Sequence, residues 1–228
     1  MKTVILSDIH GCYDQMMSLL AKTGFDEKED TFIALGDFID RGKQSFEVIE
    51  EMKRLQDVMD DRCILLRGNH EQMLIEAVVN KGFGDSYAQW RTNGANKTIS
   101  SLRKHGHKPE DVLSWCQSLK IHYETEQFIC VHAGMSVQGI SGSDLHDFVW
   151  DRTVAEDGWY HGKLLIYGHT PQEDVLYQDG HGRKVILEPE TPFKFPATGS
   201  ICLDTGCVWG RKLSTLVING NAGIIYNV

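Results

Sequence analysis

The chain has 228 residues, which is long enough for one substantial domain and too short for two comfortable ones. Hydrophobic residues make up 41% and charged residues 24%, the balance of a soluble globular protein and not of a disordered or fibrous one. The net charge is -9, from 23 basic and 32 acidic residues. This acidity argues against broad nucleic-acid binding, because affinity for a phosphate backbone needs a basic face.

The amino terminus begins with an apolar run, Val4 to Leu6, that is far shorter than the hydrophobic part of a secretory signal. No stretch approaches the roughly 20 apolar residues that span a bilayer. The six cysteines contain no C-x-x-C pair and stand mostly in apolar surroundings, so we expect buried, reduced thiols. These features predict a cytoplasmic protein that does not bind membranes.

Six short apolar runs are predicted to be buried strands, and each is followed at once by a polar turn. In chain order they cover residues 3–6, 31–35, 63–66, 128–131, 164–167 and 201–203. Apolar residues at helical spacing predict helices over 13–22, 44–59 and 71–80, between and after the first three strands. This alternation of strands and helices predicts an α/β unit with parallel strands.

The later part of the chain has a different pattern. Residues from about 84 to 120 are mostly helical in pattern, with Pro109 as a helix start, and are predicted to form a helical insertion. Because this segment has no polar turn like those after the strands, we expect it to determine substrate specificity. After Leu164 the strands alternate with loops, which indicates a more antiparallel second sheet. We predict a single domain over residues 1–228.

The polar turns carry side chains that suit a divalent transition metal. The carboxyl ends of strands in an open α/β fold collect functional groups, so these side chains should meet at one sheet edge. Together they hold more donors than one octahedral ion needs, which favours two ions about 3.5–4 Å apart. The predicted metal ligands are Asp8, His10, Asp37, Asn69, His132 and His169.

Three of the turns contain motifs whose joint occurrence is very improbable by chance. They are D-x-H-G at residues 8–11, G-D-x-x-D-R-G at 36–42 and G-N-H-E at 68–71. H-A-G at 132–134, V-W-D-R at 149–152, G-H-T at 168–170 and D-T-G at 204–206 extend the pattern. Over nearly the whole chain, these motifs resemble the metal-dependent phosphoprotein phosphatases of the calcineurin-like metallophosphoesterase superfamily. The likeness is strongest to the compact bacterial and phage serine/threonine phosphatases.

The resemblance implies a fold of two central mixed β-sheets, a β-sandwich, flanked by helices with a dinuclear metal site at the carboxyl edge of the strands. Asp8 and His10 would bind the first metal, and Asp37 would bridge to the second. The second site would be completed by Asn69, His132 and His169. Manganese is the metal that the resemblance suggests, and the nitrogen and oxygen donors also suit iron or zinc.

The resemblance also implies the roles of four catalytic residues. His70 would be the general acid that protonates the leaving oxygen, oriented by Asp40. Arg41 and Arg152 would hold the phosphate oxygens. The implied reaction is hydrolysis of phosphoserine and phosphothreonine monoesters in proteins by direct attack of a metal-bridging hydroxide. The chemistry is consistent, because two cations lower the pKa of bound water and a basic alkoxide leaving group needs a proton.

Two positions near the motifs were interpreted as structural. Ser7 stands where many relatives have glycine, and we expect it to contribute backbone and not a metal ligand. Arg67 precedes the G-N-H-E turn, and an ion pair is the expected role.

Two alternative functions remain open. The first is a symmetrical dinucleoside-tetraphosphate (Ap4A) hydrolase of the same superfamily. Such enzymes share the D-x-H-G and G-N-H motifs but tend to lack an aspartate equivalent to Asp40, and often have aspartate where this chain has Glu71. The second is a non-catalytic phosphate- or metal-binding module. A chain that had lost catalytic activity should also have lost a metal ligand, His70 or an arginine, and none of these is missing. The expected partner is a phosphorylated protein or a small phosphate ester.

Overall fold

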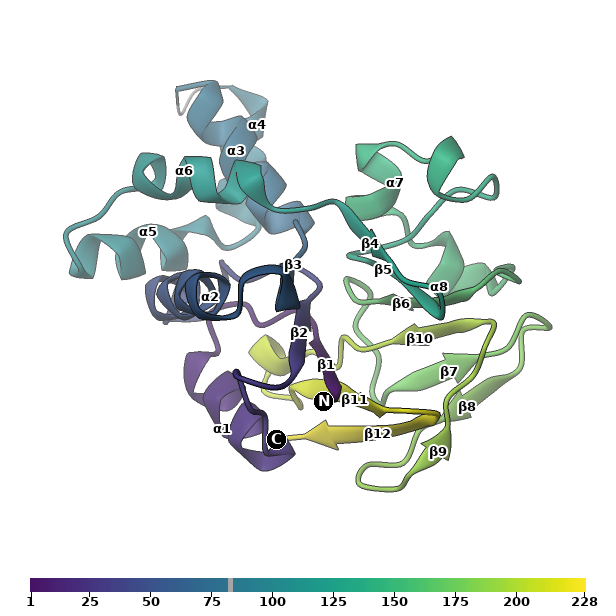
Figure 1. The fold of residues 1–228 in the computed structure, drawn as a ribbon. Coiled ribbons are helices and arrows are strands. Elements are labelled where there is room, and N and C mark those ends of the chain that lie inside the picture. The colour runs from purple at the N-terminus through teal and green to yellow at the C-terminus, as the bar shows by residue number, and fades with distance from the viewer. Residues whose placement is uncertain (82–83) are drawn as a thin grey trace.

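A computed structural model describes residues 1–81 and 84–228 of the chain. It contains two six-stranded sheets packed against each other, with helices on their outer faces (Figure 1). The predicted α/β class, with two mixed sheets flanked by helices, is confirmed.

The first sheet joins the beginning of the chain to its end. Its strand order is β3 (Cys63–Leu65), β2 (Thr31–Ala34), β1 (Thr3–Leu6), β11 (Ser214–Asn219), β12 (Ala222–Asn227) and β9 (Phe193–Lys194). Strands β1, β2 and β3 are parallel, as predicted, whereas β11 pairs with β1 in the antiparallel direction. The parallel half therefore presents three carboxyl strand ends at one edge.

The second sheet supplies further strand ends. Its order is β4 (His122–Glu124), β5 (Phe128–Val131), β6 (Leu164–Tyr167), β10 (Ser200–Cys202), β7 (Leu176–Gln178) and β8 (Lys184–Ile186). Antiparallel pairing after Leu164 is confirmed for β7 with β8 and wrong for β10 with β6. The β7–β8 hairpin lies at the sheet edge, and β10 inserts between it and β6, parallel to β6.

Alternation along the strands builds three hydrophobic layers. Val4 and Leu6 pack towards the helices on the first sheet, whereas Ile5 between them packs into the layer between the sheets. On the second sheet, Cys130 packs into that same layer and Ile129 packs towards the helices beyond. The shared central layer supports our proposal that the chain is one domain with a helical insertion.

The helices cover the two outer faces (Figure 1). On the first sheet lie α1 (Tyr13–Thr23), and also α2 (Ser45–Met59) and α3 (Asn69–Val79), against which α4 (Asp85–Thr92), α5 (Ala95–Lys104) and α6 (Pro109–Ser118) pack. On the second lie α7 (Leu145–Trp150) and α8 (Thr153–Asp157). Short 3-10 helices are η1 (Asp60–Arg62), η2 (Ile140–Gly142) and η3 (Cys207–Trp209).

Two details of the helices bear on the predictions. Helix α6 begins at Pro109, as expected for a residue that lacks an N–H group. Helix α3 begins at Asn69, earlier than the predicted residue 71, because the Glu71 side chain accepts a hydrogen bond from the Gly68 N–H and closes the first turn. Asn69 and His70 therefore lie on the first turn of a helix and not in a loop.

The cysteines are all buried and unpaired, as predicted. Of the helices within residues 1–81 and 84–228, none has both the length and the apolar character needed to cross a bilayer.

A glycine fixes the approach of β2 to β3, which gives a test of the fold. Gly36 has φ +101°, and a Cβ added there would overlap the backbone of Gly68. We expect Gly36→Ala to lower the free energy of unfolding by about 2–4 kcal/mol, measured by urea denaturation. Gly106→Ala is the matched control, because Gly106 has φ +81° and open space around it, and it should cost about 1 kcal/mol. Equal losses in the two variants would contradict the close approach.

Candidate metal centre

The six predicted ligands come together at the carboxyl edge of the strands, in turns that are up to 161 residues apart in sequence. All six are buried, with side chains drawn from the ends of β1, β2, β5 and β6 and from the start of α3. Two groups of potential ligand atoms share Asp37: one with His10 and His70, the other with His132 and His169. Within each group the atoms lie within 4.8 Å of one another.

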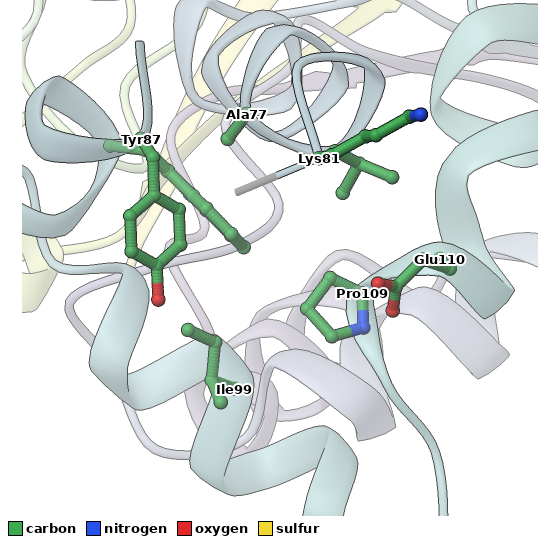
Figure 2. A pocket seen from close by; sticks show the side chains of 8 residues that line it. Ala77, Lys81, Tyr87, Ile99, Pro109 and Glu110 are labelled. Carbon is green, nitrogen blue, oxygen red and sulfur yellow. The ribbon is translucent and has the colours of Figure 1, made fainter. Parts of the chain in front are cut away.

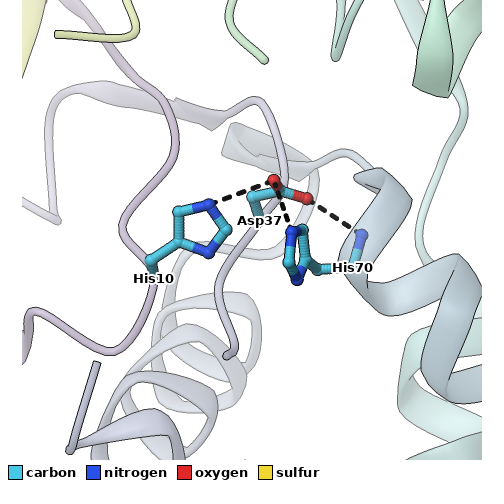
Figure 3. A group of neighbouring side chains, drawn as sticks. All are labelled: His10, Asp37 and His70. Atoms are coloured by element: carbon cyan, nitrogen blue, oxygen red, sulfur yellow. Dashed lines mark hydrogen bonds and ion pairs between the residues drawn. The ribbon is translucent and has the colours of Figure 1, made fainter. Parts of the chain in front are cut away.

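The Asp37 carboxylate is the centre of the arrangement. Its Oδ2 atom lies 3.3 Å from His10 Nε2 and 3.9 Å from His70 Nε2, and its Oδ1 atom lies 3.4 Å from His132 Nε2. Figure 3 shows His10 and His70 on either side of this carboxylate, which also accepts the His70 backbone N–H at 3.1 Å. One carboxylate thus faces both groups, as a bridging ligand would.

Hydrogen bonds fix which nitrogen of two histidines carries a lone pair. His10 Nδ1 lies 2.8 Å from the Ile39 carbonyl, and His132 Nδ1 lies 2.9 Å from the Leu35 carbonyl. A carbonyl oxygen only accepts, so both Nδ1 atoms donate, and burial lowers both pKa values and favours the neutral rings. Both Nε2 atoms therefore carry a lone pair, and they lie 3.3 and 3.4 Å from oxygens of Asp37. Such orientation of a ligand histidine through its other nitrogen is common at metal sites.

The site gathers acceptors without enough donors. Asn69 Oδ1 lies 3.0 Å from both His132 Nε2 and His169 Nδ1. Since His132 Nδ1 donates to Leu35, His132 Nε2 is an acceptor that faces the Asn69 acceptor oxygen. The Nε2 atoms of His70 and His169 are buried and have no hydrogen-bond partner. Buried polar atoms are rarely left in this state, and a divalent cation would satisfy lone pairs of this kind. The residues therefore fit a metal site.

Charge leads to the same conclusion. Burial raises the pKa of Asp37 well above its usual range, and the nearby Glu71 carboxyl raises it further. Burial also raises the pKa of Asp8, followed by the effect of Asp204. Carboxylates that are this buried are costly without a cation. The Asp8 oxygens are oriented by the His169 backbone N–H, which lies 3.2 and 3.0 Å away.

The backbone at the site is unusual. Six site residues have positive φ, out of nine non-glycine residues with this conformation in the described chain. They are Asp8, His10, Asp37, Asp40, Arg41 and His169. Left-handed conformations are unfavourable for side-chain residues and cluster at functional sites.

His70 and Asp40 form a buried pair beside Asp37. His70 Nδ1 lies 2.7 Å from Asp40 Oδ2, and burial raises the pKa of Asp40 to about 7. The same carboxylate accepts Trp90 Nε1–H at 2.8 Å and the Thr98 hydroxyl at 2.6 Å. Trp90 and Thr98 belong to α4 and α5. The helical segment at about 84–120, which was expected to determine specificity, contributes no predicted metal ligand. It instead orients Asp40, the hydrogen-bond partner of His70.

Trp90 also borders a cavity of about 500 Å³ between α3, α4, α5 and α6. Figure 2 shows Tyr87, Ile99 and Pro109 around this cavity, with Lys81 and Glu110 at its polar side. The cavity contains none of the predicted ligands. Trp90 is the residue that connects it to Asp40.

The two predicted phosphate-binding arginines approach from different elements. Arg41 Nη1 donates to His10 Nε2 at 2.6 Å, and the Arg41 N–H lies 3.4 Å from the Gly94 carbonyl. Arg152 is exposed, and its Nη1 atom donates to the His169 carbonyl at 3.3 Å. Each guanidinium therefore lies next to one predicted metal ligand.

Three further residues near the site were missed or misread from sequence. Asp204 is buried, and its carboxylate accepts the Gly206 N–H at 2.9 Å; its D-T-G motif was noted without a role. Ser7 was expected to contribute backbone and not a metal ligand, and the contact that this expectation missed is the hydrogen bond from its hydroxyl to the Asp8 carboxylate. Arg67, expected in an ion pair, instead donates to Gln72 Oε1 at 3.2 Å and to the Gln117 carbonyl at 2.6 Å.

The sequence is similar to enzymes of two kinds. A family model described as calcineurin-like phosphoesterase matches residues 1–195. Serine/threonine-protein phosphatase 1 of Salmonella typhimurium is 27% identical over 177 residues, covering 73% of this chain and 77% of that protein. An asymmetrical bis(5'-nucleosyl)-tetraphosphatase of Oceanobacillus iheyensis is 27% identical over 240 residues, covering 94% and 87%. A symmetrical bis(5'-nucleosyl)-tetraphosphatase of Klebsiella pneumoniae is 26% identical over 277 residues, covering 95% and 91%.

Solved structures share the fold. A metallophosphoesterase from Sphaerobacter thermophilus superposes with a TM-score of 0.64 at 15% identity, covering 100% of this chain and 88% of that one. A cold-active protein-tyrosine phosphatase of a Shewanella species gives 0.64 at 21% identity, covering 98% and 77%. At these identities the likeness concerns the fold alone.

Metal binding should stabilise the protein, because a cation would compensate the buried carboxylates. We expect excess Mn²⁺ to raise Tm by roughly 5–10 °C relative to EDTA, as for a ligand at about 100 times its Kd. Asp37→Asn should lose most of this rise, whereas His181→Asn, in an exposed loop, should keep it. Thermal unfolding followed by circular dichroism measures both. Equal Tm values with and without metal would count against the site.

The hydrogen bonds to Asp40 give a second test. Thr98→Val keeps the shape of the side chain but leaves the Asp40 carboxylate and backbone N–H without their hydroxyl partner. We expect a loss of about 1–3 kcal/mol in the free energy of unfolding, measured with urea. The matched control is Thr92→Val, whose exposed hydroxyl donates only to the Gln89 carbonyl. A loss no larger than that of the control would show that the Asp40 contacts contribute little.

Proposed function

The chain belongs to the calcineurin-like phosphoesterase family, and on this premise we propose that it hydrolyses phosphoserine and phosphothreonine monoesters in proteins. The resemblance to serine/threonine phosphatases in the motifs and the similarity to the Salmonella enzyme support the substrate class. The observation that carries the proposal is the buried pair of His70 and Asp40.

A phosphomonoester with an alkyl leaving group demands an acid of this kind. The departing alkoxide is strongly basic, so a proton must reach it as the bond to phosphorus breaks. In its protonated form His70 could donate one from Nε2, which has no hydrogen-bond partner, because its Nδ1 atom is bound to Asp40 at 2.7 Å. Trp90 and Thr98 hold the Asp40 carboxylate in place and so fix the ring. We assign His70 as the general acid and Asp40 as its positioning partner.

The assignment of the metal ligands follows the resemblance to the phosphatase family, and the two groups of side chains that share Asp37 support it in part. Asp8 and His10 would hold one ion, with Asp37 shared between the two. The other would be held by Asn69, His132 and His169. When bound, two divalent cations supply charge neutralisation at the phosphate and lower the pKa of a coordinated water. Mn²⁺ is the proposed metal, and the mixed nitrogen and oxygen donors also suit iron and zinc.

Arg41 and Arg152 are proposed to hold the phosphate oxygens. Each guanidinium touches a residue of the metal centre, Arg41 at His10 and Arg152 at the His169 backbone. Guanidinium groups bind phosphate oxygens through paired N–H donors and stabilise charge on the equatorial oxygens. They explain how a chain with net charge -9 can bind an anionic substrate.

A second candidate is hydrolysis of dinucleoside tetraphosphates. The observation that favours it is the coverage of the nucleotidase relatives, whose alignments span 94% and 95% of this chain. An anhydride leaves as a less basic phosphate, so the Asp40-supported acid would be less necessary. The complete set of ligands, arginines and His70 disfavours a non-catalytic binding module.

The deciding assay compares a phosphothreonine peptide with diadenosine tetraphosphate in the presence of Mn²⁺. We expect the peptide to be hydrolysed with the higher kcat/KM, and His70→Asn to lower its kcat by about 10²–10⁴-fold, the usual loss of a general acid. His181→Asn serves as the matched control and should keep wild-type rates. Faster turnover of the dinucleotide would instead make this protein a nucleotide hydrolase. If neither substrate reacted while metal was bound, the binding-module hypothesis would replace both.

A further inference from the structure

Trp209 is an exposed aromatic residue on a fixed turn. Its side chain is 62% exposed, whereas tryptophan is highly buried on average. It ends η3, which lies between Gly206 and Gly210, both with left-handed φ. The Trp209 N–H donates to the Gly206 carbonyl at 2.9 Å, so the backbone that carries the indole is hydrogen-bonded in place. The ring is therefore presented to solvent by an ordered turn.

This ring lies next to Arg41, which itself contacts the candidate metal centre. The Arg41 guanidinium carbon is 5.3 Å from the centre of the Trp209 ring, within the range of a cation–π contact. The same guanidinium donates to His10 Nε2 at 2.6 Å. Trp209 is thus separated from a predicted ligand by a single side chain. The same turn brings Arg211 close to Trp209, because a Cβ added at Gly206 would lie 3.2 Å from Arg211 Cδ and 3.4 Å from Trp209 Cδ1.

We propose that Trp209 is a specificity-determining residue whose exposed ring binds a planar aromatic group attached to the substrate phosphate. The inference rests on the proposed hydrolysis of phosphate esters at the neighbouring site. A phosphate on Arg41 would bring whatever it carries close to Trp209, because the guanidinium and the indole are in contact. Aromatic rings stack on an exposed indole, so Trp209 would add affinity for phosphate substrates that carry such a ring, beyond the serine and threonine esters proposed above.

Two sources can supply this chemistry. The flat group is the phenyl ring in a tyrosyl phosphate and the base in a nucleoside polyphosphate. Both place an aromatic ring near a phosphate, and an aromatic platform accepts either because every such ring has a π-face. Alternatively, Trp209 only positions the Arg41 side chain. In that case its removal would lower kcat/KM for all phosphate substrates by the same factor.

The test uses two matched pairs of substrates with Mn²⁺. The first pair is one peptide sequence carrying phosphotyrosine or phosphothreonine, and the second is diadenosine tetraphosphate against inorganic tripolyphosphate. For each pair the preference is the ratio of kcat/KM for the aromatic member to that for the other. We expect Trp209→Ala to lower this ratio about 5- to 10-fold in one pair, mainly through KM. The affected pair identifies the source. Trp209→Phe should restore most of the ratio.

The controls separate this inference from the proposed function. Val58→Ala alters another exposed apolar residue, on α2, and should leave every rate at the wild-type value. An active wild-type enzyme whose preferences are unchanged in Trp209→Ala would overturn the inference alone. Equal losses on both members of each pair would also overturn it, since Trp209 would then act only through Arg41. Absence of wild-type turnover on all four substrates, with metal bound, would overturn the proposed function and this inference with it.

Discussion

The burial of Asp37 among histidine lone pairs is the constraint on which the rest of the site depends. A carboxylate with almost no solvent exposure, near a second buried carboxyl on Glu71, is unfavourable unless compensating charge is present. Glu71 itself is held by N–H groups of Asp37, Phe38 and Gly68, at 2.9 Å each. This ring of contacts fixes the β2 turn against the start of α3. The same geometry leaves Asp37 oxygens facing histidines from two sides.

That arrangement explains why the turns are short, strained and rich in glycine. A side chain at Gly68 would overlap the Asp37 carboxylate, and one at Gly168 would overlap Ser7 and Asp8. The left-handed backbone at Asp8, His10 and Asp37 turns each chain sharply at the strand end. Such conformations cost free energy, which the surrounding sheets must supply. The burial of apolar side chains in the three hydrophobic layers thus stabilises the fold enough to tolerate the strained, charged turns at the sheet edge.

Local order could be predicted from the sequence far better than the contacts between distant segments. The apolar runs identified β1, β2, β3, β5, β6 and β10, and the motifs in the polar turns supplied the six predicted ligands, because alternation and motif spacing are properties of neighbouring residues. The strands β4, β7, β8, β9, β11 and β12 were not identified individually. Nothing in that pattern relates Asp40 to Trp90 and Thr98, which lie 50 and 58 positions away. The insertion of β10 beside β6 was likewise invisible, since strand order is decided by packing of the whole chain. The hydrogen bond of the Ser7 hydroxyl to Asp8 was not predicted either, because a serine beside an aspartate gives no sign of where its hydroxyl points.

The same reasoning explains why the metal centre alone does not identify the substrate. A pair of cations with two arginines would serve phosphomonoesters and phosphoanhydrides alike, since both present charged phosphate oxygens. What differs is the basicity of the leaving group and the chemical group beyond it. The first difference concerns His70 and Asp40, which the helices α4 and α5 support from one side through Trp90 and Thr98. The second difference, the chemical group beyond the phosphate, concerns the contact between Arg41 and Trp209. Trp209 lies on a turn that follows β10. Under these proposals, substrate choice is divided between two segments, and both lie outside the strands whose ends carry most of the predicted metal ligands.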